Sequence, residues 1–249
     1  MKRTTQGFLF FLLLAFAACK TYYTPSKVEW KDYRINNKAA ADTAMTGFLK
    51  PYSDNINSTM NTVIAEVSVT LDKKQPEGPL GDVLADAMHT MAQKKFNTKV
   101  DASFINFGGI RLTSLPQGNL TNGKVYELMP FDNVLVLQQL TGKELKTFLD
   151  HISKRGGWPV AGLTYDIRND RAENIKINGV PFSEQATYTI CNSDFIANGG
   201  DDCAMLRPIK QLNRNILMRD AFIEYFKDLN AQGKKITAPE SNRVRKIEG

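Results

Sequence analysis

Residues 192–202 read NSDFIANGGDD and combine an aromatic ring, two adjacent glycines and a closing pair of carboxylates. Glycine adopts backbone angles that a Cβ atom would forbid, so the chain can turn sharply after Phe195 and bring Asp201 close to whatever that ring covers. Binding residues are often found on loops of this kind. We therefore interpret this stretch as a binding loop.

Two upstream segments have a similar composition. Residues 104–111 read FINFGGIR, and residues 128–133 read LMPFDN. They add an amide, a guanidinium and a second ring that follows a proline turn. A Gly-Gly pair alone is usually only a turn, and a phenylalanine beside apolar neighbours is more often core than ligand platform. The prediction of a site therefore rests on the ordered combination.

The three segments, in this order, resemble the C-terminal, substrate-binding domain of the 5'-nucleotidase / UDP-sugar hydrolase family. Its motifs read approximately N-G-G-G-I-R, L-P-F-G-N and N-D-F-L-A-x-G-G-D-G. Residues 80–88, LGDVLADAM, also resemble that family's L-G-N-L-x-A-D-A-M helix. The resemblance implies an α+β fold of mixed sheets layered with helices. Strands and helices that follow one another without strict βαβ alternation favour the same class.

The family pattern implies a role for each site residue. Phe131 and Phe195 would be the two faces of an aromatic clamp, and stacking a nucleobase on a ring contributes about 1–3 kcal/mol. Asn106 would bond near the base edge, and Asp201 would accept hydrogen bonds from ribose hydroxyls. The remaining substrate-binding residues would be Arg111, which reaches sugar or phosphate oxygens, Asn133 in the second motif, and Lys74 near the position of a further arginine.

Three positions depart from the family pattern: Phe107, Asp132 and Asp202 each stand where the family has glycine. The rim of the site is expected to be bulkier and more acidic. Two added carboxylates should repel a polyphosphate unless a metal or lysine compensates. The expected ligand is therefore a nucleoside or a nucleoside monophosphate.

Metal-assisted phosphate-ester hydrolysis needs a cluster of Asp, Asn and His ligands around two ions. The D-x-H and G-N-H patterns of the metallophosphatases that accompany this domain do not occur in the sequence, and neither does the G-x-S-x-G motif of a serine nucleophile. The two histidines, His89 and His151, are expected to be solvated rather than metal ligands. We expect no catalytic residue and no cofactor in this chain, with two divalent ions supplied by a partner metallophosphatase domain on a separate chain.

Two other functions stay open. The chain could serve as a nucleoside-binding module without a catalytic partner, or as a structural surface lipoprotein that kept the fold and lost the pocket. Nucleic acid is not an expected partner, because the net charge of +6 is not concentrated in a long run of Lys or Arg.

The N-terminal residues resemble a bacterial lipoprotein signal. Lys2 and Arg3 precede the apolar run 8–16, and small residues lead to Cys19. The prediction is a signal peptide over 1–18, lipidation at Cys19, a tether over 19–43 and a domain over 44–249. The protein would be exported and anchored by lipid to a bacterial membrane, facing the periplasm or the cell surface. An ordinary secreted protein with a coincidental cysteine is the alternative.

Periodicity predicts the elements that carry these segments. Strands are expected at 63–71, 99–106, 134–137 and 187–190, and helices at 80–91, from a capping box at Thr141, and at 216–229. Asn178-Gly179 predicts a hairpin. Asp82, Asp86 and His89 are expected on the polar face of the first helix. Cys191 and Cys203 could form a disulfide or stay as two buried thiols.

Overall fold

The computed structural model describes residues 26–32, 41–239 and 242–248. The chain divides into two units, Met1–Phe48 and Leu49–Gly249. Helix α2, Thr43–Met60, contains the boundary between them, and none of its residues is buried. The predicted signal peptide and Cys19 lie outside the described residues, so the domain limits remain predictions. No helix within the described ranges is long and apolar enough to cross a bilayer.

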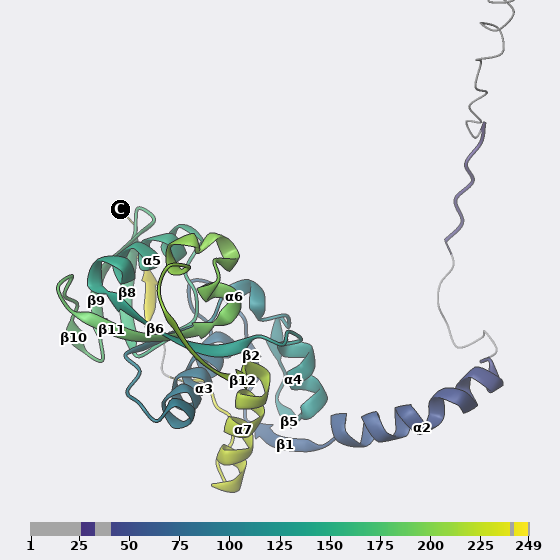
Figure 1. Ribbon diagram of the computed structural model, residues 1–249. Helices are drawn as coiled ribbons and strands as arrows, with labels where there is room; N and C mark the ends of the chain where they lie inside the picture. Colours follow the sequence, from purple (N-terminus) through teal and green to yellow (C-terminus); the bar gives the residue numbers. More distant parts are fainter. Residues whose placement is uncertain (1–25, 33–40, 240–241, 249) are drawn as a thin grey trace, which may run out of the picture. The chain divides into compact units, whose positions relative to one another are not determined.

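The second unit is built on a five-stranded sheet (Figure 1). Its strands, in spatial order, are β12 (Gln211–Leu217), β6 (Val134–Thr141), β11 (Thr187–Ser193), β3 (Ala102–Phe104) and β7 (Val160–Ala161). Strand β11 pairs parallel with β3 and antiparallel with β6. The C-terminal ends of β11 and β3 therefore lie at the same edge of the sheet as the start of β6.

Helices cover both faces of this sheet. Figure 1 shows α5 (Gly142–Lys154) on one side of β6 and β11, and α3 (Pro79–Phe96) with α7 (Met218–Ala231) on the other. Alternation along β11 divides the core accordingly: Cys191 belongs to the buried cluster of α3 and α7, and Ile190 to the buried cluster of α5. This arrangement confirms the predicted α+β fold of mixed sheets layered with helices.

The described residues of this unit also form three smaller sheets. A four-stranded sheet has the order β10 (Val180–Pro181), β9 (Arg171–Ile177), β8 (Leu163–Arg168), β13 (Val244–Lys246). The predicted Asn178-Gly179 hairpin is confirmed, since it joins β9 to β10. The strand predicted over 63–71 is wrong as one element. Its two parts, β1 (Val63–Val67) and β2 (Leu71–Asp72), pair with different partners, β5 (Gly118–Thr121) and β4 (Ser114–Leu115).

The ends of two helices test the sequence rules for helix boundaries. The capping box is confirmed: Glu144 N donates to Thr141 Oγ1 over 3.3 Å, and Thr141 N donates to Glu144 Oε2 over 2.8 Å. The last helix begins later than predicted, at Met218. Leu217 still belongs to β12, because it pairs with Val134 of β6. Apolar periodicity alone cannot separate the end of a strand from the first turn of a following helix.

The polar face predicted for α3 is partly buried, which corrects that expectation. Asp82 is 1% exposed, and neither of its carboxylate oxygens has a hydrogen-bond donor among the described residues. Burial, followed by the nearby Glu77 carboxylate, raises the pKa of Asp82 to about 7, although Arg243 opposes the shift. Asp86 binds Arg243 through two bonds of 2.7 and 2.8 Å. Next to them, His89 contacts Ser103 Oγ at 3.1 Å instead of being solvated.

Replacing the buried acid should change how stability depends on pH. Between the ordinary pKa of an aspartate and about 7, folded Asp82 holds a proton that the unfolded chain has lost. The free energy of unfolding should therefore fall as pH rises through this range, by up to about 1.4 kcal/mol per pH unit. Asp82→Asn should flatten that slope and stabilise the protein at pH 8, as measured by urea unfolding between pH 5 and pH 8.

The matched control is Asp170→Asn, which removes an exposed carboxylate from a turn where an asparagine also tolerates the positive φ of 60°. This control should keep the slope of the parent protein. An Asp82→Asn protein with the parent slope would contradict the assignment of the proton to Asp82.

Candidate functional site

Three loops meet at one edge of the five-stranded sheet. The first loop follows β3, the second precedes β6 and the third follows β11. Ser193 of β11 pairs with Leu135 of β6, and this register brings the second and third loops together. They enclose a pocket of about 280 Å³. It is lined by two glycines and by all of the predicted binding residues except Lys74: Asn106, Gly108, Gly109, Arg111, Phe131, Asn133, Phe195 and Asp201.

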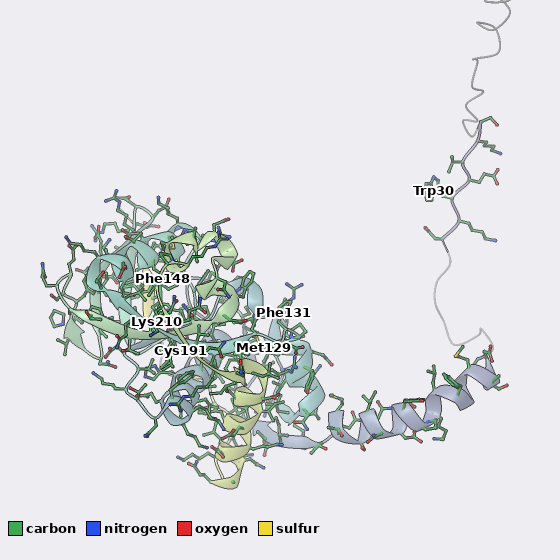
Figure 2. All side chains as sticks on the ribbon, viewed as in Figure 1. Trp30, Met129, Phe131, Phe148, Cys191 and Lys210 are labelled. Carbon is green, nitrogen blue, oxygen red and sulfur yellow. The ribbon has the colours of Figure 1, made fainter. Side chains whose placement is uncertain are left out.

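The two rings are exposed although they are large and apolar. Phe131 is 42% exposed and Phe195 is 44% exposed, whereas Phe148 in the core is fully buried. Figure 2 shows Phe131 on the side of the fold where α4 (Asn122–Leu128) lies, and Phe148 further inside. Partly exposed rings at a pocket wall are suited to stack on a flat ligand.

A hydrogen bond between side chains joins the first loop to the third. Asn106 Nδ2 donates to Asp201 Oδ2 over 2.8 Å, and Asn106 is 6% exposed. Asp201 has a left-handed backbone, with φ 50° and ψ 38°, inside the short helix η2 (Gly200–Asp202). Its carbonyl accepts from His151 Nε2 over 2.9 Å. His151 is therefore a support of the site and not a solvated side chain as expected; its partner lies 50 positions away, so local pattern gave no signal for it.

The glycines of the two loops allow close approach. A Cβ atom on Gly109 would lie 2.7 Å from Asn106 Oδ1, and one on Gly200 would overlap the Phe195 ring. Gly199 has a φ of +89°, a conformation that favours glycine. The predicted sharp turn is therefore present, and it brings Phe195 and Asp201 to the same pocket.

The cations differ from the prediction. Lys74 does not line the pocket; it pairs with Asp72 at 3.5 Å. Lys73 lies near Arg111 instead: its Nζ donates to Ile110 O over 2.8 Å and sits 3.9 Å from the centroid of the Phe107 ring. Burial and the Arg111 charge lower the pKa of Lys73. Lys73 and Lys74 both follow the end of β2, Leu71–Asp72, so the local sequence pattern gave no signal that favours Lys73.

Each added carboxylate at the rim has an arginine partner. Asp132 binds Arg219 at 2.7 Å, and Asp202 binds Arg155 at 3.0 Å. The charge of each added carboxylate is therefore compensated by an arginine, where the sequence analysis had considered a metal or a lysine. Arg219 and Arg155 come from α7 and from the end of α5, far from Asp132 and Asp202 in the sequence.

The pocket does not fit a pair of divalent ions. Among the residues that line it, Asp201 is the one carboxylate, and a guanidinium lies on the same wall. In the described part of the chain, no group of three or more His, Cys, Asp or Glu side chains is placed to hold a metal. Cys191 and Cys203 are two buried thiols, not a disulfide. Burial raises the pKa of both, that of Cys203 to about 12.

Comparison with known proteins identifies the family. The family model described as "5'-nucleotidase, C-terminal domain" matches residues 58–208. The chain belongs to this family. It is 27% identical over 187 residues to a 5'-nucleotidase of Vibrio vulnificus, covering 70% of this chain and 32% of that protein. It is 28% identical over 211 residues to "Endonuclease YhcR" of Bacillus subtilis, covering 80% of this chain and 17% of that protein.

A solved structure of the same family supports the fold. The 5'-nucleotidase precursor from Thermus thermophilus superposes with a TM-score of 0.71 at 29% identity, covering 84% of this chain and 44% of that one. The present chain thus spans less than half the length of each of these three relatives. The resemblance found in the four sequence motifs and the α+β fold that it implied are both confirmed.

Adjacent glycines in the first loop provide a test of the pocket geometry. Gly109→Ala should lower the free energy of unfolding by about 1–3 kcal/mol, because the new methyl group would press on the Asn106 amide that holds Asp201. Gly108→Ala is the matched control: a Cβ there meets nothing within 4 Å, so the change should stay within about 0.5 kcal/mol. Equal effects in urea unfolding would contradict the close approach at Gly109.

Proposed function

We propose that this chain is the substrate-binding domain of a 5'-nucleotidase-type hydrolase in nucleotide catabolism, and that its pocket takes a nucleoside or a nucleoside monophosphate. The observation that carries the proposal is the gathering of two exposed rings, the Asn106–Asp201 pair and Arg111 around one pocket. A volume of about 280 Å³ lies near the lower end of the range for small-molecule sites, roughly 300–1,000 Å³. This favours a small ligand over a polyphosphate.

The residue types match the parts of such a ligand. A nucleobase has two flat apolar faces, which Phe131 and Phe195 would cover, and edges that bond to an amide such as Asn106. Asp201 Oδ1 accepts no hydrogen bond from a described residue, so it is available to a ribose hydroxyl. Its orientation is fixed in advance by the bond that Oδ2 accepts from Asn106. Preorganisation of this kind reduces the entropy lost when a ligand binds.

Arg111 supplies the positive charge for a phosphate or a sugar oxygen. Its guanidinium lies 5.9 Å from the centroid of the Phe131 ring, and its one side-chain hydrogen bond to a described residue goes to Gly108 O over 3.3 Å. It makes no ion pair with any carboxylate of the described ranges. Most of its donors are therefore left for a ligand, and their planar arrangement suits an oxyanion.

Hydrolysis would need groups from elsewhere. We propose that a metallophosphatase domain on a separate chain supplies two divalent ions and the attacking hydroxide, while this chain binds and orients the nucleoside. The same proposal includes export and a lipid anchor at Cys19, which would confine the domain and its partner to one membrane surface. A nucleoside-binding module without a partner would use the same pocket.

Removing either ring should weaken ligand binding. Phe131→Ala and Phe195→Ala should each raise the Kd for adenosine and for AMP by roughly 5- to 150-fold, because each loses about 1–3 kcal/mol of stacking. The measurement is isothermal titration calorimetry. Phe182→Ala is the matched control, since Phe182 stacks on Tyr188 with ring centroids 5.6 Å apart and does not line the pocket. A folded parent protein that binds neither ligand would contradict a nucleoside site in this chain.

The division of labour between two chains has its own test. The purified chain with Mn²⁺ or Zn²⁺ should leave AMP intact, and the protein isolated from native membranes should carry a stoichiometric metallophosphatase. Hydrolysis of AMP by the chain alone at enzyme-like rates would rule out the separate-partner proposal. Isolation without a phosphatase would favour the module that binds without catalysis.

A further inference from the structure

Arg219 is a buried cation in the first turn of α7. Its side chain donates hydrogen bonds to the segment 129–133, the arm of the site that carries Phe131. Its side chain is 9% exposed, and it does not line the pocket. Its Nη2 donates to Asp132 Oδ1 over 2.7 Å, and its Nη1 donates to Phe131 O over 3.3 Å. A longer bond of 3.5 Å joins Nη1 to Met129 O. Arg219 thus contacts the backbone on both sides of Pro130.

Backbone hydrogen bonds fix the two ends of this arm. Met129 N donates to Val125 O over 2.9 Å, and Asn133 O accepts from Met218 N over 2.8 Å. In between, the hydrogen bonds that Phe131 and Asp132 make with described residues all involve Arg219. Figure 2 labels Met129 and Phe131 close together, on the side of the fold where α4 lies. Between the two ends of the arm, Arg219 therefore supplies the hydrogen bonds that hold the backbone carrying the exposed ring.

The guanidinium is itself held in place. It lies 4.1 Å from the centroid of the Tyr126 ring in α4, a distance at which a cation is attracted to the face of an aromatic ring. Its Nε is buried and has no hydrogen-bond partner among the described residues. Asp132 is its one carboxylate partner in the described part of the chain, and the Asp132 side chain is 79% exposed. A fixed arginine thus orients an exposed aspartate, and not the reverse.

We propose that Arg219 is a positioning residue for the nucleobase site: it sets the direction of the Phe131 ring through the Phe131 carbonyl and Asp132, without touching the ligand. This inference rests on the proposed function. The Asp132 side chain gives the arm an anchor that a glycine at this position could not provide. The electrostatic effect of Asp132 is therefore on its own loop rather than on the ligand.

A double-mutant cycle distinguishes positioning from general stability. Asp132→Asn and Arg219→Met should each weaken binding of adenosine by about tenfold in the parent protein. Both effects should shrink to less than about twofold when Phe131 is Leu, since the ring that Arg219 positions is then absent. Asp132 is exposed, so Asp132→Asn keeps the test available if Arg219→Met fails to fold. Equal losses in both backgrounds would overturn the proposal.

The matched control is Arg214→Met. Arg214 also donates to a backbone carbonyl, Lys95 O, and lies over a ring, that of Phe96, but it is not in contact with the arm. Adenosine affinity should be unchanged by this substitution. A tenfold loss at Arg214 as well would show that the effect is not specific to Arg219 and would overturn the proposal.

Backbone order parameters from nitrogen-15 relaxation test the anchoring without a ligand. The order parameters of residues 131–133 should fall from about 0.85, the value of a rigid backbone, to below about 0.6 in Asp132→Asn and Arg219→Met, and should stay unchanged in Arg214→Met. Unchanged order parameters in the first two variants would overturn the positioning role whatever the affinities are. Reduced order in these variants, with a parent protein that binds neither adenosine nor AMP, would support the anchoring and reject the proposed function, so the two failures are distinguishable.

Discussion

The pairing of β11 with a parallel neighbour on one side and an antiparallel neighbour on the other is the constraint on which the site depends. Parallel pairing sends the chain out of β3 and β11 at the same edge of the sheet, and antiparallel pairing brings it into β6 there. A shift of one residue in either register would turn the Cys191 side of β11 from one core cluster to the other. Burial on both faces therefore fixes where the three loops meet.

Long-range polar contacts then hold each loop to the body of the domain. Asn106 joins the first loop to the third, His151 of α5 supports the backbone of Asp201, and Arg219 of α7 holds the arm before β6. The two rings are exposed at the pocket, and these polar contacts hold the loops that carry them. Two of the three anchors are carried by helices on opposite sides of the sheet, His151 by α5 and Arg219 by α7.

The loops were predictable from the sequence because their chemistry is local. Two glycines next to an aromatic residue, or a proline before one, indicate a turn within a few residues. Four motifs in the right order are enough to indicate the family. The supports could not be predicted, since Arg219 lies 87 positions from Asp132 and His151 lies 50 from Asp201. The prediction that Asp82 lies on a polar helix face is incorrect for a related reason. Helical periodicity marks which positions share a face, but only the tertiary packing of Glu77 and Arg243 shows that an acidic position is buried.

The pocket walls come from segments separated by as many as 95 positions, as the Asn106–Asp201 bond shows. Such a pocket exists only after β3, β6 and β11 have all paired, so neither a fragment nor a partly folded chain can form it. A ligand that binds there binds the native state alone and shifts the folding equilibrium toward it, by an amount that grows with the logarithm of its concentration. A nucleoside bound as proposed would thus stabilise the folded domain, and the resistance of the domain to proteolysis would rise with the nucleoside concentration.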